Sequence, residues 1–136
     1  MLKIPARCYE EMVAHCQGRY PKEACGLLAG RTLDGPVTQV YPMTNVEDSP
    51  IGYSMDPKEQ LLVEKQMRSL GQRMLAIFHS HTASDAYPSS VDVSLAISPD
   101  ISYVLVSLKN QQQPVVKSYR IAGTVVEEEQ MAQVGG

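Results

Sequence analysis

Two histidines separated by one serine, His79 and His81, are the residues whose types and spacing most directly suggest chemistry in this chain. They follow the apolar residues 74–78, which have the length and composition of a buried strand. Residues two apart on a strand point to the same face, so the two imidazoles can lie side by side. Imidazole is the commonest metal ligand among side chains. The pair therefore suggests two of the ligands of a metal ion.

A third ligand and an oxyanion donor can come from the residues that follow. A catalytic zinc ion ordinarily takes three protein ligands from histidine and carboxylate and keeps the fourth position for water. Asp92, in the first turn of a short helix predicted to begin near Ser89, can fold back toward the histidines. The Ser89 hydroxyl, at the start of that helix, is placed to stabilise the oxyanion that develops when an amide is attacked.

Amide hydrolysis also needs a base. Zinc lowers the pKa of its bound water to about 7, and a carboxylate near the metal can take the proton and hand it to the leaving amine. Glu23 opens a short apolar strand predicted over residues 24–30. If that strand lies beside the one that carries the histidines, Glu23 lies at the same end of the sheet.

Each of these features also has a simpler explanation. A His-x-His pair alone is often two ordinary surface or core histidines. Ser89 and Asp92 have the Ser-x-x-Asp spacing of a capping box, which can serve only to begin a helix. Glu23, preceded by proline and lysine, would by itself be a solvated surface charge. Taken singly, the residues leave these alternatives open.

Composition and charge narrow the class of protein. The 136 residues are 43% hydrophobic and 20% charged, as expected for one soluble globular domain. A formal net charge of -3 gives no basic excess for binding nucleic acid. We expect no secretory signal and no membrane span, and hence a cytoplasmic location. Cys8, Cys16 and Cys25 form no Cys-x-x-Cys pair, so we expect buried packing residues, and Cys25 is disfavoured as a nucleophile.

The elements that must position the candidate site alternate between strand and helix. Apolar residues recur at helical spacing from Tyr9 to Cys16, after a short strand at residues 2–4. Further strands are predicted over residues 24–30, 37–43, 74–78, 103–108 and 115–121, with a hairpin turn at Asp34-Gly35 and a long loop over residues 44–55.

A second helix is well marked by its ends. Asp56 can cap it, Pro57 fits its first position, Glu59 completes a capping-box pattern, and Gly71 stands where a helix would end. Its apolar face is predicted to comprise Leu62, Val63, Met67 and Leu70. The mixture of elements predicts an α/β fold, a three-layer α-β-α single domain with a central mixed β-sheet. The domain is expected over residues 1–126, followed by a flexible acidic tail over residues 127–136.

The joint pattern resembles a known family. His-Ser-His, seven residues, Ser, two residues and Asp is the spacing of the JAMM (MPN-plus) metallopeptidase motif, and Glu23 resembles the upstream glutamate of that family. The resemblance implies His79, His81 and Asp92 as ligands of one zinc ion per chain, Glu23 as general acid/base and Ser89 as oxyanion stabiliser. It also implies the JAMM/MPN, cytidine-deaminase-like architecture.

The resemblance covers nearly the whole chain. Residues 21–28 and 45–57 look like the compact prokaryotic members that stand alone. The sequence departs from the family at Thr82, where a proline is usual. Other zinc chemistries lack their residues, because the chain contains neither a His-Glu-x-x-His nor a Pro-Cys-x-x-Cys motif.

The substrate that the resemblance implies is a ubiquitin-like or sulfur-carrier protein, cleaved at the amide bond after its C-terminal Gly-Gly. An extended tail can pair through main-chain hydrogen bonds while its glycines approach the metal closely. Two other hypotheses are a non-catalytic MPN-type scaffold and a DNA-repair-associated relative, the second disfavoured by the acidic charge. A homodimer is left open. The chain's own Gly135-Gly136 is expected to be a frayed end rather than a carrier tail.

Overall fold

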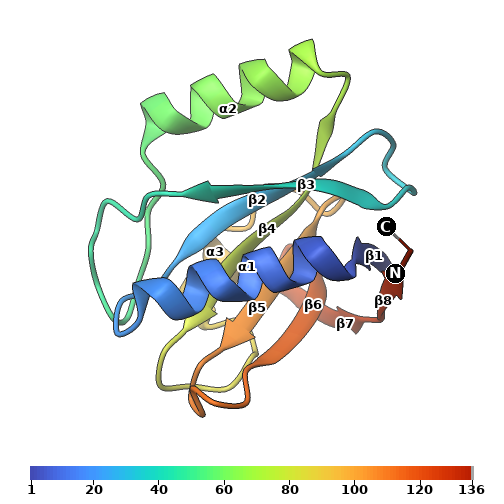
Figure 1. The fold of residues 1–136 in the computed structure, drawn as a ribbon. Coiled ribbons are helices and arrows are strands. Elements are labelled where there is room, and N and C mark those ends of the chain that lie inside the picture. The colour runs from blue at the N-terminus through green and yellow to red at the C-terminus, as the bar shows by residue number, and fades with distance from the viewer. Residues whose placement is uncertain (136) are drawn as a thin grey trace.

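A six-stranded mixed sheet in the order β3-β2-β4-β5-β6-β7 runs through the structure, a computed structural model that describes residues 1–135 (Figure 1). Within it β4 and β5 are parallel and every other neighbouring pair is antiparallel. A second sheet pairs β1 with β8 in parallel. The elements in chain order are β1 (Leu2–Pro5), α1 (Ala6–Arg19), β2 (Cys25–Gly30), β3 (Val37–Met43), α2 (Pro57–Ser69), β4 (Arg73–His81), α3 (Ser90–Ser94), β5 (Ser102–Ser107), β6 (Val115–Ala122), β7 (Val125–Glu129) and β8 (Met131–Val134).

Helices cover both faces of this sheet. Successive residues of a strand point to opposite faces, and β2 is buried along its whole length. Leu28 packs in one core cluster with Met12 and Cys16 of α1, whereas Leu27 packs in another with Met67 of α2. In Figure 1, α1 crosses the near face of the sheet while α2 lies above the β2–β3 edge. The predicted three-layer α-β-α arrangement with a central mixed sheet is confirmed.

The central strands follow from their composition. A continuous apolar run is typical of a strand buried on both faces, and β2 pairs with both β3 and β4. The turn between β2 and β3 contains the predicted Gly35, whose N–H donates to the carbonyl of Thr32 at 3.1 Å. Strand β4 extends beyond the apolar residues to His81, so both histidines belong to the strand. Their orientation is therefore fixed by the sheet.

Helix α2 begins as predicted but packs differently. The Asp56 side chain accepts from the Lys58 N–H at 2.9 Å and Pro57 is the first helical residue. The predicted capping role of Glu59 is wrong: its carboxylate accepts from the backbone N–H of Thr44 at 2.7 Å and from the Thr44 hydroxyl at 3.0 Å. This pair ties α2 to the end of β3.

The predicted apolar face of α2 is also partly wrong. Leu62 is 66% exposed and Leu70 is 47% exposed, and Met67 is the one buried residue of the helix. The helix lies over β3 and β4 near one edge of the sheet. A helix at an edge can bury only a narrow stripe, which explains why a broader apolar face does not form.

The predicted flexible tail forms strands instead. Residues 125–129 pair with β6, and residues 131–134 pair with β1. The Glu129 carboxylate is mostly buried and accepts hydrogen bonds from the hydroxyls of Ser102 and Ser118 and from Arg120 Nε. These donors lie far from Glu129 in the chain, so an acidic composition alone did not reveal them. Of the predicted Gly135-Gly136 end, Gly136 lies outside the described residues.

No helix within residues 1–135 is both long enough and apolar enough to cross a membrane.

Candidate metal centre and cleft

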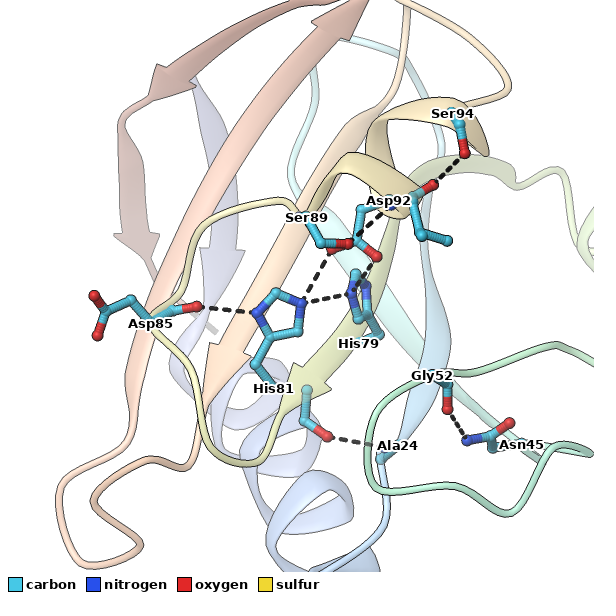
Figure 2. A network of polar contacts seen from close by, with 11 residues as sticks. Ala24, Asn45, Gly52, His79, His81, Asp85, Ser89, Asp92 and Ser94 are labelled. Atoms are coloured by element: carbon cyan, nitrogen blue, oxygen red, sulfur yellow. Dashed lines mark hydrogen bonds and ion pairs between the residues drawn. The ribbon is translucent and has the colours of Figure 1, made fainter.

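His79 and His81 lie side by side at the end of β4, as their spacing predicts (Figure 2). Both are buried, and their Nε2 atoms are 3.3 Å apart. The neighbouring strands hold this end of β4, because His79 pairs with Cys25 of β2 and with Leu105 of β5. The Tyr53 ring stacks on the His79 ring with centroids 4.5 Å apart. The sheet and this stacking contact together fix the two imidazoles.

Asp92 completes a group of three ligands. Its Oδ1 lies 3.2 Å from His79 Nε2, and its Oδ2 lies 3.1 Å from His81 Nε2. In a tetrahedral zinc site with bonds of about 2.0–2.1 Å, neighbouring ligand atoms are roughly 3.3 Å apart. The spacing of the three side chains therefore fits a metal ion between them.

The proton on His81 is placed by a second contact. His81 Nδ1 lies 2.9 Å from the backbone carbonyl of Asp85, and a carbonyl can only accept, so Nδ1 carries the hydrogen. In the neutral ring, Nε2 then presents a lone pair toward Asp92. This contact is the typical outer-shell partner of a metal-bound histidine, because it fixes the tautomer and the ring orientation. Lone pairs that converge in this way call for a cation.

The pKa shifts of His81 and Asp92 both favour opposite charges on these two side chains, whereas the pKa of His79 is set by its burial. Burial lowers the pKa of His79. Burial opposes ionisation of Asp92, but hydrogen bonds with His79 and His81 hold its pKa well below its usual range. Burial also opposes charge on His81, yet its hydrogen bonds with Asp92 and the Asp85 carbonyl raise its pKa. Asp92 therefore favours a proton on His81 Nε2, and a metal ion bound between the two side chains would take the place of that proton.

Ser89 and Asp92 form a capping box at the start of α3. Asp92 Oδ2 accepts from the Ser89 N–H at 2.8 Å, and Ser89 Oγ accepts from the Asp92 N–H at 3.1 Å. The two interpretations of the Ser-x-x-Asp spacing are therefore compatible, because the cap also orients the carboxylate toward the histidines. Ser89 also lines the cleft described next. Its hydroxyl oxygen accepts in the capping box, so its hydroxyl hydrogen stays available as a donor.

A cleft of ≈ 370 Å³ opens beside the three ligands. Glu23, His81, Ser89 and Asp92 line it together with residues 50–53. We call residues 46–54, which connect β3 to α2 by way of Met55 and Asp56, the cleft loop. The cleft therefore brings together all the side chains for which the sequence predicts chemistry, apart from the deeper His79.

Glu23 lies just before β2 and is 6% exposed. Burial raises the pKa of its carboxyl to about 7; the His81 charge lowers it, whereas the Asp92 and Glu47 charges raise it. A carboxyl with a pKa near neutrality can both take up and release a proton at physiological pH. The expectation that an isolated Glu23 is a solvated charge does not apply here.

A further polar contact borders the cleft. The Thr82 hydroxyl donates to the Pro50 carbonyl at 2.9 Å and so joins the end of β4 to the cleft loop.

Cys25, buried in β2, is a packing residue as predicted, because burial raises the pKa of its thiol to about 12 and keeps it protonated.

Three residues of the site were missed at the sequence level. Asp85 contributes its backbone carbonyl, so its residue type carries no signal. Tyr53 and Asn45 belong to a segment predicted only as a long loop. Asn45 had one available signal, an amide next to a strand end that can cap a turn. The roles of Glu23, Ser89, His79, His81 and Asp92 in metal binding and catalysis stay predictions.

Comparison with known proteins places these features in context. The family described as prokaryotic homologs of the JAB domain matches residues 5–122. The CysO-cysteine peptidase of Mycobacterium tuberculosis (strain ATCC 25618 / H37Rv) is 44% identical over 129 residues, which cover 95% of this chain and 88% of that protein. A desampylase of Haloferax volcanii is 32% identical and covers 78% of this chain and 80% of its own length.

A solved structure agrees closely with the fold. The solution structure of a Desulfitobacterium hafniense protein has a TM-score of 0.90 and 45% sequence identity, and covers 100% of this chain and 94% of that chain. The likeness therefore extends over both the sheet and the segment that carries the candidate ligands.

Proposed function

The chain belongs to the family of prokaryotic JAB-domain homologues and is a peptidase, and from this premise we propose that it uses zinc to hydrolyse the amide bond after the C-terminal Gly-Gly of a sulfur-carrier or ubiquitin-like protein. The observation that carries the proposal is the placement of Glu23 in one cleft with His81, Asp92 and Ser89. A metal ligand set, a base and a hydroxyl donor are the groups that amide hydrolysis needs.

Zinc is proposed because of the donor set. Two imidazole nitrogens and one carboxylate oxygen are typical of catalytic zinc sites, which leave a fourth position for water. His79, His81 and Asp92 would hold the ion. When bound, zinc supplies Lewis-acid activation of a water molecule for attack on the amide carbonyl.

The side chains of the cleft would divide the remaining work. Glu23 takes a proton from the attacking water and passes it to the leaving amine as the C–N bond breaks; once the second proton of the water has also reached the amine, the products are a carboxylate and an ammonium group. The Ser89 hydroxyl donates to the carbonyl oxygen as negative charge develops on it. Ser89 is fixed for this role because its backbone N–H and its Oγ both take part in the capping box.

The substrate class rests on two kinds of support. The relatives described above are named CysO-cysteine peptidase and desampylase. The cleft is small, and the apolar side chains of Ile51, Val91 and Leu95 form part of its wall. A tail that ends in two glycines can approach the metal where a residue with a side chain would collide. The complete ligand set argues against the scaffold hypothesis.

The experiment that tests the proposal measures metal and turnover together. Zinc content and cleavage of a sulfur carrier extended beyond its Gly-Gly would be compared for the wild type, for Glu23→Gln, and for Glu10→Gln as a control at an exposed position of helix α1. We expect Glu23→Gln to keep its zinc and lose turnover, and Glu10→Gln to keep both. Unchanged turnover in Glu23→Gln would remove Glu23 from the mechanism. A wild type that purifies without zinc in the absence of chelators would overturn the choice of metal.

A further inference from the structure

The backbone N–H and carbonyl of Glu23 bond to the segment between β3 and α2, whereas those of the next residue, Ala24, bond to Ser80 of β4. The ladders that join β2 to β3 and β4 begin at Cys25. The Glu23 N–H donates to the carbonyl of Ser49 at 2.8 Å, and its carbonyl accepts from Asn45 Nδ2 at 2.9 Å. Both backbone groups of the proposed base therefore bond to the segment between β3 and α2, which also lines the cleft.

Asn45 organises that segment with its whole hydrogen-bonding capacity. Its Nδ2 donates to the carbonyls of Glu23 and Gly52, and its Oδ1 accepts from the N–H groups of Glu47 and Ser54, all at 2.9–3.0 Å. The side chain is 4% exposed. A carboxamide has two donor hydrogens and two acceptor lone pairs, so only one orientation of Asn45 satisfies all four partners. Figure 2 shows Asn45 directed at the carbonyl of Gly52.

The same loop carries the surface that a substrate must touch. Pro50, Ile51, Gly52 and Tyr53 line the cleft. The Pro50 carbonyl is tied to Thr82 at the end of β4, while the far side of the loop is tied to Glu23 through Asn45. A movement of the wall is thus transmitted to the backbone of Glu23.

We propose that Asn45 is a positioning residue for the reaction, one that joins the substrate-binding wall of the cleft to the proton-transferring Glu23 so that the two move as one unit. The proposal rests on the proposed function for its chemistry. Its physical basis is that a misplacement of a catalytic group by about 1 Å can cost about 10²-fold in rate. Asn45 itself does not touch the reacting atoms.

Two variants separate this role from that of the wall alone. In Asn45→Ala, Glu23 loses the donor to its carbonyl, so we expect kcat to fall at least tenfold while KM changes less than threefold and zinc content is retained. In Thr82→Val, the wall loses its bond to β4 but stays joined to Glu23 through Asn45, so we expect KM to rise and kcat to fall with it. A rise in KM with kcat unchanged would mean that the wall and Glu23 move separately, and would overturn the proposal. Asn110→Ala, an exposed asparagine that also accepts a backbone N–H, is the matched control and should resemble the wild type.

A measurement without substrate keeps the test independent of activity. In metal-loaded protein, hydrogen exchange of the Glu47 and Ser54 amides should accelerate in Asn45→Ala because their acceptor is gone. The Glu23 amide, which binds Ser49 and not Asn45, should also accelerate if the loop and Glu23 form one unit. Exchange at Glu23 equal to that of the wild type would overturn the proposal, and so would an unchanged kcat.

Asn45→Asp provides a second test in case Asn45→Ala does not fold. Aspartate has the same shape and can still accept from Glu47 and Ser54, but it presents an oxygen to the carbonyls of Glu23 and Gly52. We expect the same loss of kcat. A loss in Asn45→Asp without one in Asn45→Ala would assign the effect to the new charge and overturn the proposal. If the metal-loaded wild type fails to cleave the conjugate, the proposed function fails. Hydrogen exchange of the Glu23 amide then still tests whether the cleft loop and Glu23 move together.

Discussion

One oxygen of Asp92 serves both a helix and the candidate metal centre: Oδ2 accepts from the Ser89 N–H at 2.8 Å and lies 3.1 Å from His81 Nε2. The cap of α3 therefore sets the direction of the carboxylate. The helix has only five residues, and a helix this short is not stable by itself. Its role in the structure is to present Ser89 and Asp92 to the cleft.

Ser89→Ala should separate the hydroxyl of Ser89 from its backbone. The variant keeps the N–H that binds Asp92, so we expect zinc to be retained. It loses a cap worth about 1 kcal/mol and a donor to the oxyanion worth about 10²–10³-fold in kcat. Steady-state kinetics and zinc analysis measure both effects. Ser94→Ala is the control, because its hydroxyl bonds to the Val91 carbonyl at the other end of the same helix. Full turnover in Ser89→Ala would rule out the donor role.

Asp92→Asn should abolish the gain in stability that zinc gives. A ligand that binds only the folded state stabilises it by about 4 kcal/mol at a thousandfold excess over Kd, so we expect zinc to raise the melting temperature of the wild type. The amide is a much poorer zinc ligand, so this rise should vanish in the variant. Asp56→Asn, the same substitution at the cap of α2, should leave it unchanged. Equal zinc-induced shifts in wild type and Asp92→Asn would contradict the ligand assignment.

The raised pKa of Glu23 predicts how the stability of the metal-free protein depends on pH. The folded state holds the Glu23 proton up to a pKa of about 7, whereas the ordinary value is 4.5. The stabilisation from this proton is therefore complete below pH about 4.5 and is lost as the pH rises through about 7. Glu23→Gln, which is neutral at every pH, should gain stability over the wild type across that interval.

Urea unfolding in the presence of a chelator at pH 4.5, 6 and 8 tests this expectation. The difference between Glu23→Gln and the wild type should grow with pH, and Glu10→Gln should show no such trend. A difference that stays constant between pH 4.5 and 8 would mean that Glu23 titrates at its ordinary pKa.

Glu129→Ala should destabilise the whole domain, although its segment is acidic and was expected to be flexible. The substitution leaves the hydroxyls of Ser102 and Ser118 without their acceptor and removes the partner of Arg120. Hydrogen bonds to a charged group contribute about 1.5–3 kcal/mol each, so the two bonds from the buried hydroxyls alone predict a loss of about 3–6 kcal/mol. Chemical denaturation measures it. Glu127→Ala, at an exposed position of the same strand, should cost less than about 0.5 kcal/mol; equal losses would mean that Glu129 has no special role.

The parts of the site that could be predicted depend on local geometry. Alternation along a strand places His79 beside His81, and helix capping places Asp92 near Ser89, so both arrangements follow from spacing alone. Glu23 required one more assumption, that β2 lies beside β4, and the antiparallel register of Cys25 with His79 fulfils it. The central strands could also be predicted from a local pattern, because each is a continuous apolar run.

The parts that could not be predicted depend on partners far away in the chain. Glu59 contacts Thr44 across a loop, and Glu129 gathers donors from two other strands, so neither contact follows from local spacing. The contribution of Asp85 comes from a carbonyl that every residue has. Leu62 and Leu70 fit a helical apolar face, but the position of α2 at the edge of the sheet leaves them exposed.

The metal ligands and the base enter the site along different routes through the chain. His81 and Asp92 are 11 positions apart, on a strand and the turn of helix that follows it, whereas Ala24, next to the base, meets Ser80 across 56 positions. The metal ligands thus all lie within one short segment of the chain, residues 79–92. The acid/base residue lies in a distant segment and is brought to them by sheet pairing. A descendant that lost only the glutamate would keep a metal-binding scaffold with no hydrolytic activity. A single codon change would therefore convert the hydrolase into an inactive scaffold.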